Sequence, residues 1–306
     1  MEQPIHKIPI IKPPALSEGD PIGIISPAGP VDESELQSGL ELLKTSGFKV
    51  RLGSHVFDRK GYLAGKDDAR LEDLHHMLQD DEIKAVFCTR GGYGTLRLLK
   101  AIHYDLIGQK PKIIVGYSDI TALLLAIHSK TGLITFHGPM VRGLVNGNKG
   151  NWDSLIKLLT SHSLKIDLSP CSVLRPGKVS GPLIGGNLSM ICHLLGTPFL
   201  PSLEGCIFFI EDRGEPLYRL DRMLTHLMLT GKLKGISALI TGQFEGCGDK
   251  AGINRLLNRM VSDLDIPLVT EFPVGHGNEN FALPIGLTAE LDTERMTLTA
   301  EDACVG

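Results

Sequence analysis

Short runs of β-branched and apolar residues alternate with amphipathic stretches through the first half of the chain. Strands joined by crossover helices produce this pattern, because each helix covers an apolar face of a parallel sheet. Five such units in about 160 residues predict a doubly wound, flavodoxin-like sheet, a fold that places ligands at the carboxyl ends of its strands. We expect strands at residues 22–26, 49–52, 83–89, 112–117 and 133–136, and helices at 33–45, 69–78, 93–102, 120–128 and 152–160.

The second half is richer in strand patterns. Residues 161–178 have only a weak period and contain Ser, Pro, Cys and Gly, which is typical of a linker or of a cross-over between domains. We therefore predict two domains, residues 1–165 and residues 166–306, the second being a β-rich α/β domain. Its strands are expected at 179–184, 206–211, 238–243, 268–274, 287–291 and 296–299, the last two as a pair, and its one strong helix at 218–229.

The composition argues against several classes of partner. A formal net charge of -4 provides no basic surface for nucleic acid, and no apolar run approaches the length that spans a bilayer. Six cysteines without C-x-x-C spacing and no visible secretory signal favour a reducing cytoplasm. No H-E-x-x-H segment occurs, so we expect neither a metal nor another cofactor. The apolar helix at 218–229 suits either the core or the interface of a homodimer.

Ser118 stands between an apolar strand and an apolar helix, in the sequence Gly116-Tyr-Ser-Asp119. A serine in such a sharp turn projects its hydroxyl from the edge of the sheet, at the positive end of the helix, as nucleophiles do. The second glycine of G-x-S-x-G is missing, however, and Ser118 or Asp119 also suits the cap of the helix. On this segment alone, both a nucleophile and a cap stay open.

Three glycines follow the strand expected at 83–89, in the sequence Arg90-Gly-Gly-Tyr-Gly94. Glycines at the carboxyl end of a strand let the backbone approach a ligand and direct N–H groups at it. In a hydrolase, such a loop binds the oxyanion of a tetrahedral intermediate. The spacing is neither G-x-G-x-x-G nor that of a phosphate-binding loop, and a purely structural turn stays open.

A serine nucleophile needs a histidine base and a carboxylate that orients the base. His276 lies in a glycine-flanked turn after one apolar strand, and His137 lies at the carboxyl end of another. Strand position does not choose between them. Glu211 ends a strongly apolar strand, where an acidic side chain is costly unless it is paired. Asp212 and Glu215 are close alternatives for the carboxylate.

Together these segments resemble the LD-carboxypeptidases, also called muramoyltetrapeptide carboxypeptidases. The resemblance runs almost the whole length of the chain, and the order and spacing of its segments make it specific. The matching segments are Gly23-Ile-Ile-Ser-Pro-Ala-Gly29, Thr89-Arg-Gly-Gly-Tyr-Gly94, Gly116-Tyr-Ser-Asp119, Phe136-His-Gly-Pro139, Gly185-Gly-Asn-Leu188, Glu211-Asp-Arg-Gly-Glu-Pro216, Arg219-Leu-Asp-Arg222, Gly275-His-Gly277 and Leu283-Pro-Ile-Gly286.

The resemblance implies a catalytic triad divided between the two domains. By position in the family's motifs, Ser118 is the nucleophile, Glu211 is the carboxylate and His276 is the base, which is the choice over His137 that strand position did not make. The resemblance also implies an oxyanion hole. Its members are the loop residues Gly91 and Gly92 and the backbone N–H of Asp119.

The substrate implied is a murein tetrapeptide from cell-wall recycling, which the enzyme cuts between its third residue and the terminal D-alanine. A carboxypeptidase must hold a free carboxylate, and Arg90 and the amide of Asn187 are the candidates, although an ordinary surface arginine is the simpler interpretation of Arg90. One alternative is a self-immunity peptidase of the same family that cleaves peptidyl-nucleotide antibiotics, which needs an aromatic surface. The chain has one tryptophan, Trp152. Another alternative is a non-catalytic module that binds a small anion.

Overall fold

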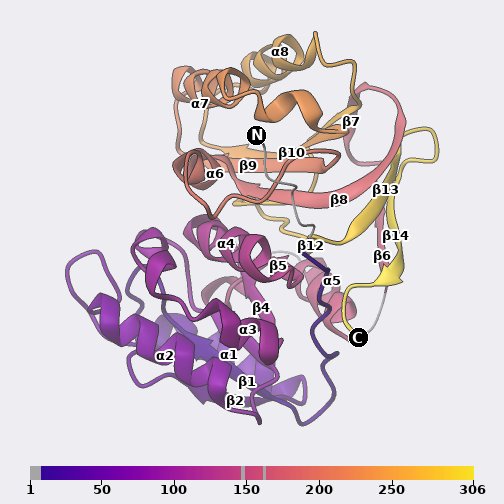
Figure 1. Cartoon of the computed structure of the whole chain (residues 1–306). Helices are drawn as coiled ribbons and strands as arrows, with labels where there is room; N and C mark the ends of the chain where they lie inside the picture. Colours follow the sequence, from indigo (N-terminus) through magenta and orange to yellow (C-terminus); the bar gives the residue numbers. More distant parts are fainter. Residues whose placement is uncertain (1–7, 146–148, 161–162) are drawn as a thin grey trace.

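The computed structural model describes residues 8–145, 149–160 and 163–306. They form two lobes, each built on one sheet, with the first half of the chain in one lobe and most of the second half in the other (Figure 1). In the first sheet, β2, β1, β3, β4 and β5 lie parallel in that order, and β12 closes the edge beside β5. The bounds are β1 Pro21–Ile25, β2 Lys49–Leu52, β3 Ala85–Cys88, β4 Ile113–Gly116, β5 Thr135–His137 and β12 Leu283–Ile285.

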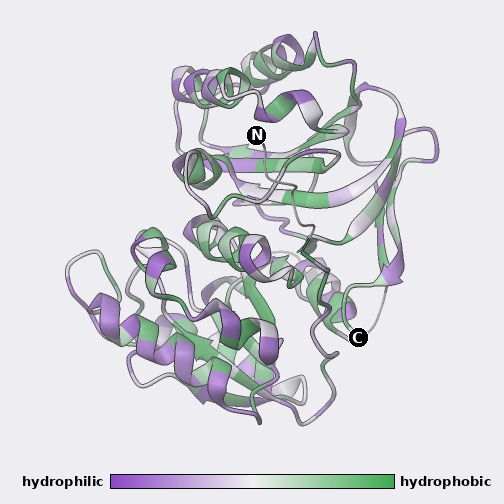
Figure 2. Ribbon diagram, viewed as in Figure 1, coloured by the Kyte–Doolittle hydropathy of each residue, from purple (hydrophilic) through white to green (hydrophobic). Residues whose placement is uncertain are grey.

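The five parallel strands have the flavodoxin-like order, which confirms the predicted fold class. Strands β3 and β4 are buried along their whole length, as expected where helices cover both faces of a parallel sheet. Hydrophobic colour fills the strands, while hydrophilic colour marks the outer faces of the surface helices (Figure 2). The helices of this lobe are α1 Glu33–Thr45, α2 Asp67–Gln79, α3 Tyr104–Gln109, α4 Thr121–Thr131 and α5 Lys149–Leu159.

Helix α4 differs from the others in being buried on every side over residues 121–128. Its sequence is apolar all round, which only a helix enclosed by other elements tolerates. It packs against β4 and β5 of its own lobe and against α6 (Leu188–Leu194) and β8 (Lys178–Asn187) of the other (Figure 1). The helix that follows Ser118 is therefore part of the contact between the lobes.

The helix predicted at 93–102 is wrong. The segment forms two short 3₁₀ turns, Thr95–Arg97 and Leu99–Ala101. Gly94 precedes the first turn with φ +135°, and Thr95 turns its N–H and hydroxyl to the carboxylate of Asp119. This attachment to the neighbouring strand end replaces the regular start of an α-helix.

The second sheet is mixed, with strand order β6, β14, β13, β8, β9, β10, β11, β7. Strands β8 to β11 are parallel, and β13 pairs with β14 antiparallel, as predicted for that pair. The helices α6, α7 (Leu217–Leu229) and α8 (Lys250–Val261) belong to this lobe, and of these only α7 was expected. The remaining strand bounds are β6 Ser163–Asp167, β7 Ser172–Arg175, β9 Ile207–Arg213, β10 Ala238–Glu245, β11 Leu268–Thr270, β13 Thr288–Asp292 and β14 Thr297–Ala303.

Two predictions in this half are wrong. The segment 161–178 was expected as a linker, but beyond residues 161–162, which lie outside the described part, it contributes both edge strands of the second sheet. The strand predicted at 268–274 ends at Thr270, because Glu271 adopts a left-handed conformation with φ +61° and turns the chain. The division at residue 165 stays a prediction. Residues of β6 flank it, and β12, far beyond it, completes the first sheet.

Candidate active site

Ser118 lies in a strained turn between β4 and α4. Its φ is +62°, a left-handed conformation that costs a residue with a side chain about 1–2 kcal/mol. Gly116 makes the turn possible, because a Cβ there would lie 2.5 Å from the side chain of Ile120. A cap needs no such strain, whereas an exposed nucleophile at a sharp strand-to-helix turn has it. The geometry therefore favours the nucleophile reading of this segment.

The glycine loop lies directly against Ser118. A Cβ on Gly91 would lie 2.8 Å from both Cβ and Oγ of Ser118 and 3.3 Å from the backbone nitrogen of Asp119. Gly92 has φ +122°, which few residues other than glycine adopt. Within the described ranges, no acceptor bonds the backbone N–H of either glycine. The three positions predicted for the oxyanion hole thus lie together beside the serine.

The side chain of Asp119 joins this loop to the turn. Its buried carboxylate accepts the backbone N–H of Thr95 at 3.0 Å and the hydroxyl of Thr95 at 2.8 Å. The same hydroxyl lies 2.6 Å from the backbone oxygen of Asp119. Two strand ends that are far apart in sequence are therefore held at a fixed spacing.

Glu211 and His276 form a buried pair on the other lobe. Oε2 of Glu211 lies 2.6 Å from Nδ1 of His276, and the side chains are 0% and 11% exposed. Glu211 stands near the end of β9, and His276 lies in the loop after β11. Gly275 has φ +112° and passes so close to Glu211 that a Cβ would lie 2.6 Å from the same carboxylate oxygen. The carboxylate fixes one ring nitrogen and leaves the other for chemistry.

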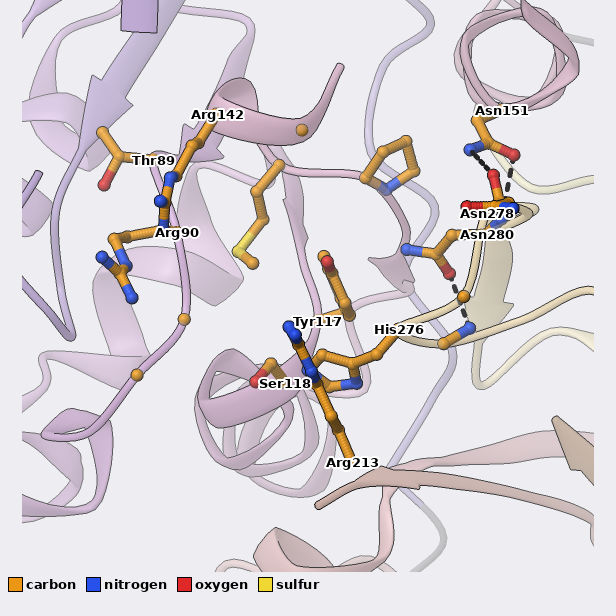
Figure 3. Close-up of a pocket in the computed structure, with 17 residues that line it drawn as sticks. Thr89, Arg90, Tyr117, Ser118, Arg142, Asn151, Arg213, His276, Asn278 and Asn280 are labelled. Carbon is orange, nitrogen blue, oxygen red and sulfur yellow. Dashed lines mark hydrogen bonds between the residues drawn. The ribbon is translucent and has the colours of Figure 1, made fainter. Parts of the chain in front are cut away.

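The side chains of two asparagines, Asn151 and Asn280, hold the His276 loop, and the sequence reasoning missed them. The side-chain oxygen of Asn280 accepts the N–H of Gly275 at 2.9 Å. Asn151, on α5 of the first lobe, bonds the backbone N–H of Asn280 at 2.8 Å and the backbone oxygen of Asn278 at 3.1 Å (Figure 3). The loop that carries the imidazole is therefore tied to both lobes.

His137, the other histidine considered as a base, is fully buried beneath the site. Its ring contacts those of Tyr117 and Phe209, and its nitrogens are buried with the amide of Asn280 as their one polar neighbour of note among the described residues. Burial, helped by the charge of His276, lowers the pKa of His137 to about 3. His276, not His137, faces the open cavity.

Ser118 and His276 line one cavity of about 590 Å³ between the lobes (Figure 3). No hydrogen bond joins Ser118 to His276 within the part of the chain that is described, as is common in enzymes without substrate. Among the described residues that line the cavity are three arginines and no carboxylate. The lining residues are Thr89, Arg90, Gly91, Gly92, Tyr117, Ser118, Pro139, Met140, Arg142, Gly143, Asn151, Arg213, Gly275, His276, Gly277, Asn278 and Asn280.

Of the two residues predicted to hold substrate, only Arg90 lines the cavity. Asn187 is buried outside it, where its amide donates to Asp212 at 3.0 Å and accepts from the N–H of Met190 at the start of α6. Its backbone N–H donates to Thr121 in the first turn of α4. These contacts fix the junction between the lobes, so we do not carry Asn187 into the proposed site.

The described residues contain no group of three or more His, Cys, Asp or Glu side chains arranged for a metal ion. No helix in the described ranges is long and apolar enough to cross a bilayer. The cavity offers a serine, an oriented imidazole, backbone donors and arginines.

The comparisons with known proteins agree with this geometry. The LD-carboxypeptidase N-terminal domain matches residues 22–138, and the LD-carboxypeptidase C-terminal domain matches residues 180–291. A probable murein peptide carboxypeptidase of Bacillus subtilis is 41% identical over 95% of this chain and 94% of its own length.

Two solved structures share the fold over nearly the whole chain. The muramoyltetrapeptide carboxypeptidase from Oxalobacter formigenes has a TM-score of 0.83 and 32% identity over 91% of this chain and 97% of its own. The self-immunity protein MccF, solved with glutamyl sulfamoyl guanosine, has a TM-score of 0.89 and 27% identity over 96% and 99%. The chain belongs to the LD-carboxypeptidase family of peptidases.

Proposed function

We propose that this chain is a serine carboxypeptidase that hydrolyses the LD-peptide bond of murein tetrapeptides and releases the terminal D-alanine. One observation carries the proposal: the strained turn of Ser118 and the Glu211–His276 pair open onto the same cavity. A nucleophile, a base and an orienting carboxylate are the three groups that acyl transfer from a serine requires.

In the proposed mechanism, the free ring nitrogen of His276 takes the proton of Ser118 as Oγ attacks the scissile carbonyl. The backbone N–H groups of Gly91, Gly92 and Asp119 stabilise the oxyanion. His276 then gives its proton to the leaving amine, D-alanine departs, and an acyl-enzyme forms. Water, deprotonated by His276, hydrolyses the ester and restores the serine. Glu211 stays ionised and stabilises the imidazolium throughout.

The substrate class is supported by names and by the lining of the cavity. Two of the similar proteins are named as murein peptide or muramoyltetrapeptide carboxypeptidases, and such peptides carry free carboxylates that suit an arginine-lined cavity without acids. Roles in cell-wall recycling, a cytoplasmic location and a homodimer stay predictions.

A nucleotide-bearing substrate is less well supported. Trp152 is 9% exposed on α5 and does not line the cavity. Apart from His276, Tyr117 is the one aromatic residue among the described lining residues, and it is largely buried, with its pKa raised by burial and by the charge of Glu211. The cavity thus lacks an exposed ring on which a nucleobase could stack.

D-alanine release from a murein tetrapeptide by the purified protein, beside its Ser118→Ala variant, tests the proposal. We expect release by the parent and a loss of about a millionfold in kcat for the variant, with the fold unchanged. A fluorophosphonate probe should label the parent at Ser118 and leave the variant unlabelled. A variant that retains half the activity would refute Ser118 as nucleophile. Absence of both release and labelling would favour a non-catalytic anion-binding module.

A further inference from the structure

The three arginines that line the cavity lie on two sides of Ser118. Arg90 precedes the glycine loop, and the backbone N–H of Arg142 donates to Thr89, so both belong to the side of the oxyanion donors. Arg213 comes from the other lobe, at the end of β9 (Figure 3). These two groups therefore meet different parts of a peptide that spans the serine.

Arg90 and Arg142 are engaged by their own lobe. Arg90 donates to the backbone oxygen of Pro30 at 3.2 Å, and its pKa is lowered by burial and by the charge of Arg142. Arg142 lies 2.5 Å from a carboxylate oxygen of Glu35. Arg213 is exposed, and no hydrogen bond or ion pair engages its guanidinium within the described ranges. Among the described residues that line the cavity, Arg213 is thus the arginine whose guanidinium makes no hydrogen bond or ion pair at all.

The backbone of Arg213 is fixed, although its side chain is exposed. Its N–H donates to the neighbouring Asp212 at 2.8 Å, and the buried carboxylate of Asp212 also accepts from Asn187 at 3.0 Å and from Ser189. Arg213 lies in register with Glu245 of the neighbouring β10. The ordered backbone of strand β9 therefore sets the direction in which the guanidinium of Arg213 extends.

Strand geometry places Arg213 on the same face as Glu211. Side chains two residues apart on a strand point the same way and are about 7 Å apart. Glu211 points at His276, and Figure 3 shows Arg213 reaching toward Ser118, Tyr117 and His276 from that side. Burial and the charge of Glu211 raise the pKa of Tyr117, and the charge of Arg213 opposes this rise; the ring of Tyr117 lies 5.0 Å from that of His276. Arg213 and the base therefore share one end of the cavity.

The direction of the reaction decides which end of the peptide lies there. His276 must give a proton to the leaving amine, so the leaving residue lies on the His276 side of Ser118. In an exopeptidase this residue carries the free carboxylate, one residue beyond the cut bond. Guanidinium groups bind carboxylates through two parallel hydrogen bonds, which makes arginine the suited partner.

We infer that Arg213 binds the terminal carboxylate of the leaving residue and so restricts the enzyme to chain ends. The inference rests on the proposed function for its direction, since it uses the role of His276. It replaces Arg90 as the carboxylate ligand. The same strand then orients the base through Glu211 and recognises the chain end through Arg213.

Binding to the Ser118→Ala variant tests the inference without turnover. The probes are a murein tetrapeptide and the same peptide with a C-terminal carboxamide, each titrated by calorimetry. We expect the acid to bind about ten- to a hundredfold more tightly than the carboxamide. Adding Arg213→Gln should remove this preference by weakening the binding of the peptide acid while leaving the binding of the carboxamide unchanged. Arg213→Lys should keep part of the preference. Equal binding of acid and carboxamide, or a preference that survives Arg213→Gln, would overturn the inference.

The matched control is Arg255→Gln, an exposed arginine of α8 that does not line the cavity, for which we expect an unchanged preference. The proposed function is judged separately, by D-alanine release and fluorophosphonate labelling of the chain with Ser118 intact. A parent that turns over and an acid preference indifferent to Arg213 would leave the function standing and refute Arg213. If the parent neither releases D-alanine nor is labelled, but the preference for the acid depends on Arg213, the proposed function is refuted and the binding role of Arg213 stands.

Discussion

Oε2 of Glu211 lies 2.6 Å from Nδ1 of His276, although the residues are 65 positions apart, one within β9 and the other in the loop after β11. This contact fixes which nitrogen of the imidazole faces the cavity. It also gives the fully buried carboxylate of Glu211 an imidazole as its partner in place of water. The predictions below start from this pair.

Glu211→Gln should lower kcat for D-alanine release by about 10³–10⁴-fold and leave KM little changed. The amide keeps the shape of the side chain but loses the charge that stabilises the imidazolium. Glu215→Gln is the control, because Glu215 pairs with Arg219 on the surface and was a sequence-level alternative. Comparable losses in both variants, or full activity of Glu211→Gln, would contradict the assignment.

Ser118→Gly should give a more stable protein than Ser118→Ala, by about 1 kcal/mol in the free energy of unfolding. Both variants lose the nucleophile, but only glycine relaxes at φ +62°. Urea denaturation of the two inactive variants measures the difference. If the glycine variant proved the less stable one, strain at this turn would not be part of the site.

Gly91→Ala should reduce kcat by at least a hundredfold, because the added methyl would meet Oγ of Ser118 at 2.8 Å and displace an oxyanion donor. Gly143→Ala is the matched control. Gly143 also lines the cavity, but a Cβ there meets no heavy atom within 4 Å. Steady-state kinetics of both variants measure the effect. Equal losses of kcat in Gly91→Ala and Gly143→Ala would contradict the role of Gly91 as an oxyanion donor.

The stability of the protein should fall as the pH drops below about 6.5, partly because of His137. Its pKa is about 3 in the folded chain, below the value of about 6.5 in an unfolded one. Between these values the unfolded chain binds a proton that the folded one excludes, so this residue contributes up to about 1.4 kcal/mol per pH unit.

His137→Phe should therefore flatten the dependence of unfolding free energy on pH between 6.5 and 4.5. Urea denaturation at several pH values measures the slope, whatever the variant loses in absolute stability. His226→Gln, at an exposed position on α7, should leave the slope unchanged. An unchanged slope in His137→Phe would mean that His137 takes up a proton in the folded protein as readily as in the unfolded chain.

The sequence predicted the first lobe well because its strands are apolar runs bounded by helices with clear periods. The helix 33–45 was predicted with its observed bounds, since four buried apolar positions follow an acidic capping box at Asp32. The elements of the second lobe were harder to predict from the sequence. Helix α8 has a cap at Asp249 and buried Ile253, Leu256 and Leu257 at helical spacing, a signal that was present and overlooked.

Other features have no local signal. Strand β12 is three residues long with a proline at its centre, and its partner β5 lies about 150 positions earlier. Burial separates His276 from His137. Tyr117 contacts both rings, but Phe209 packs against His137, whereas His276 lines the cavity. The role inferred for Arg213 depends on strand register with Glu211, and the sequence analysis did not consider this residue.

The pairing of β12 with β5 has a consequence for the order of synthesis. A ribosome that has made the whole nucleophile-bearing lobe has not yet made the three residues that cover its sheet edge. Until residues 283–285 emerge, β5 presents unpaired backbone groups, which invite pairing with another chain. The edge of the nascent first lobe is therefore exposed to aggregation while the residues between β5 and β12 are synthesised, and it is protected only when residues 283–285 return to it.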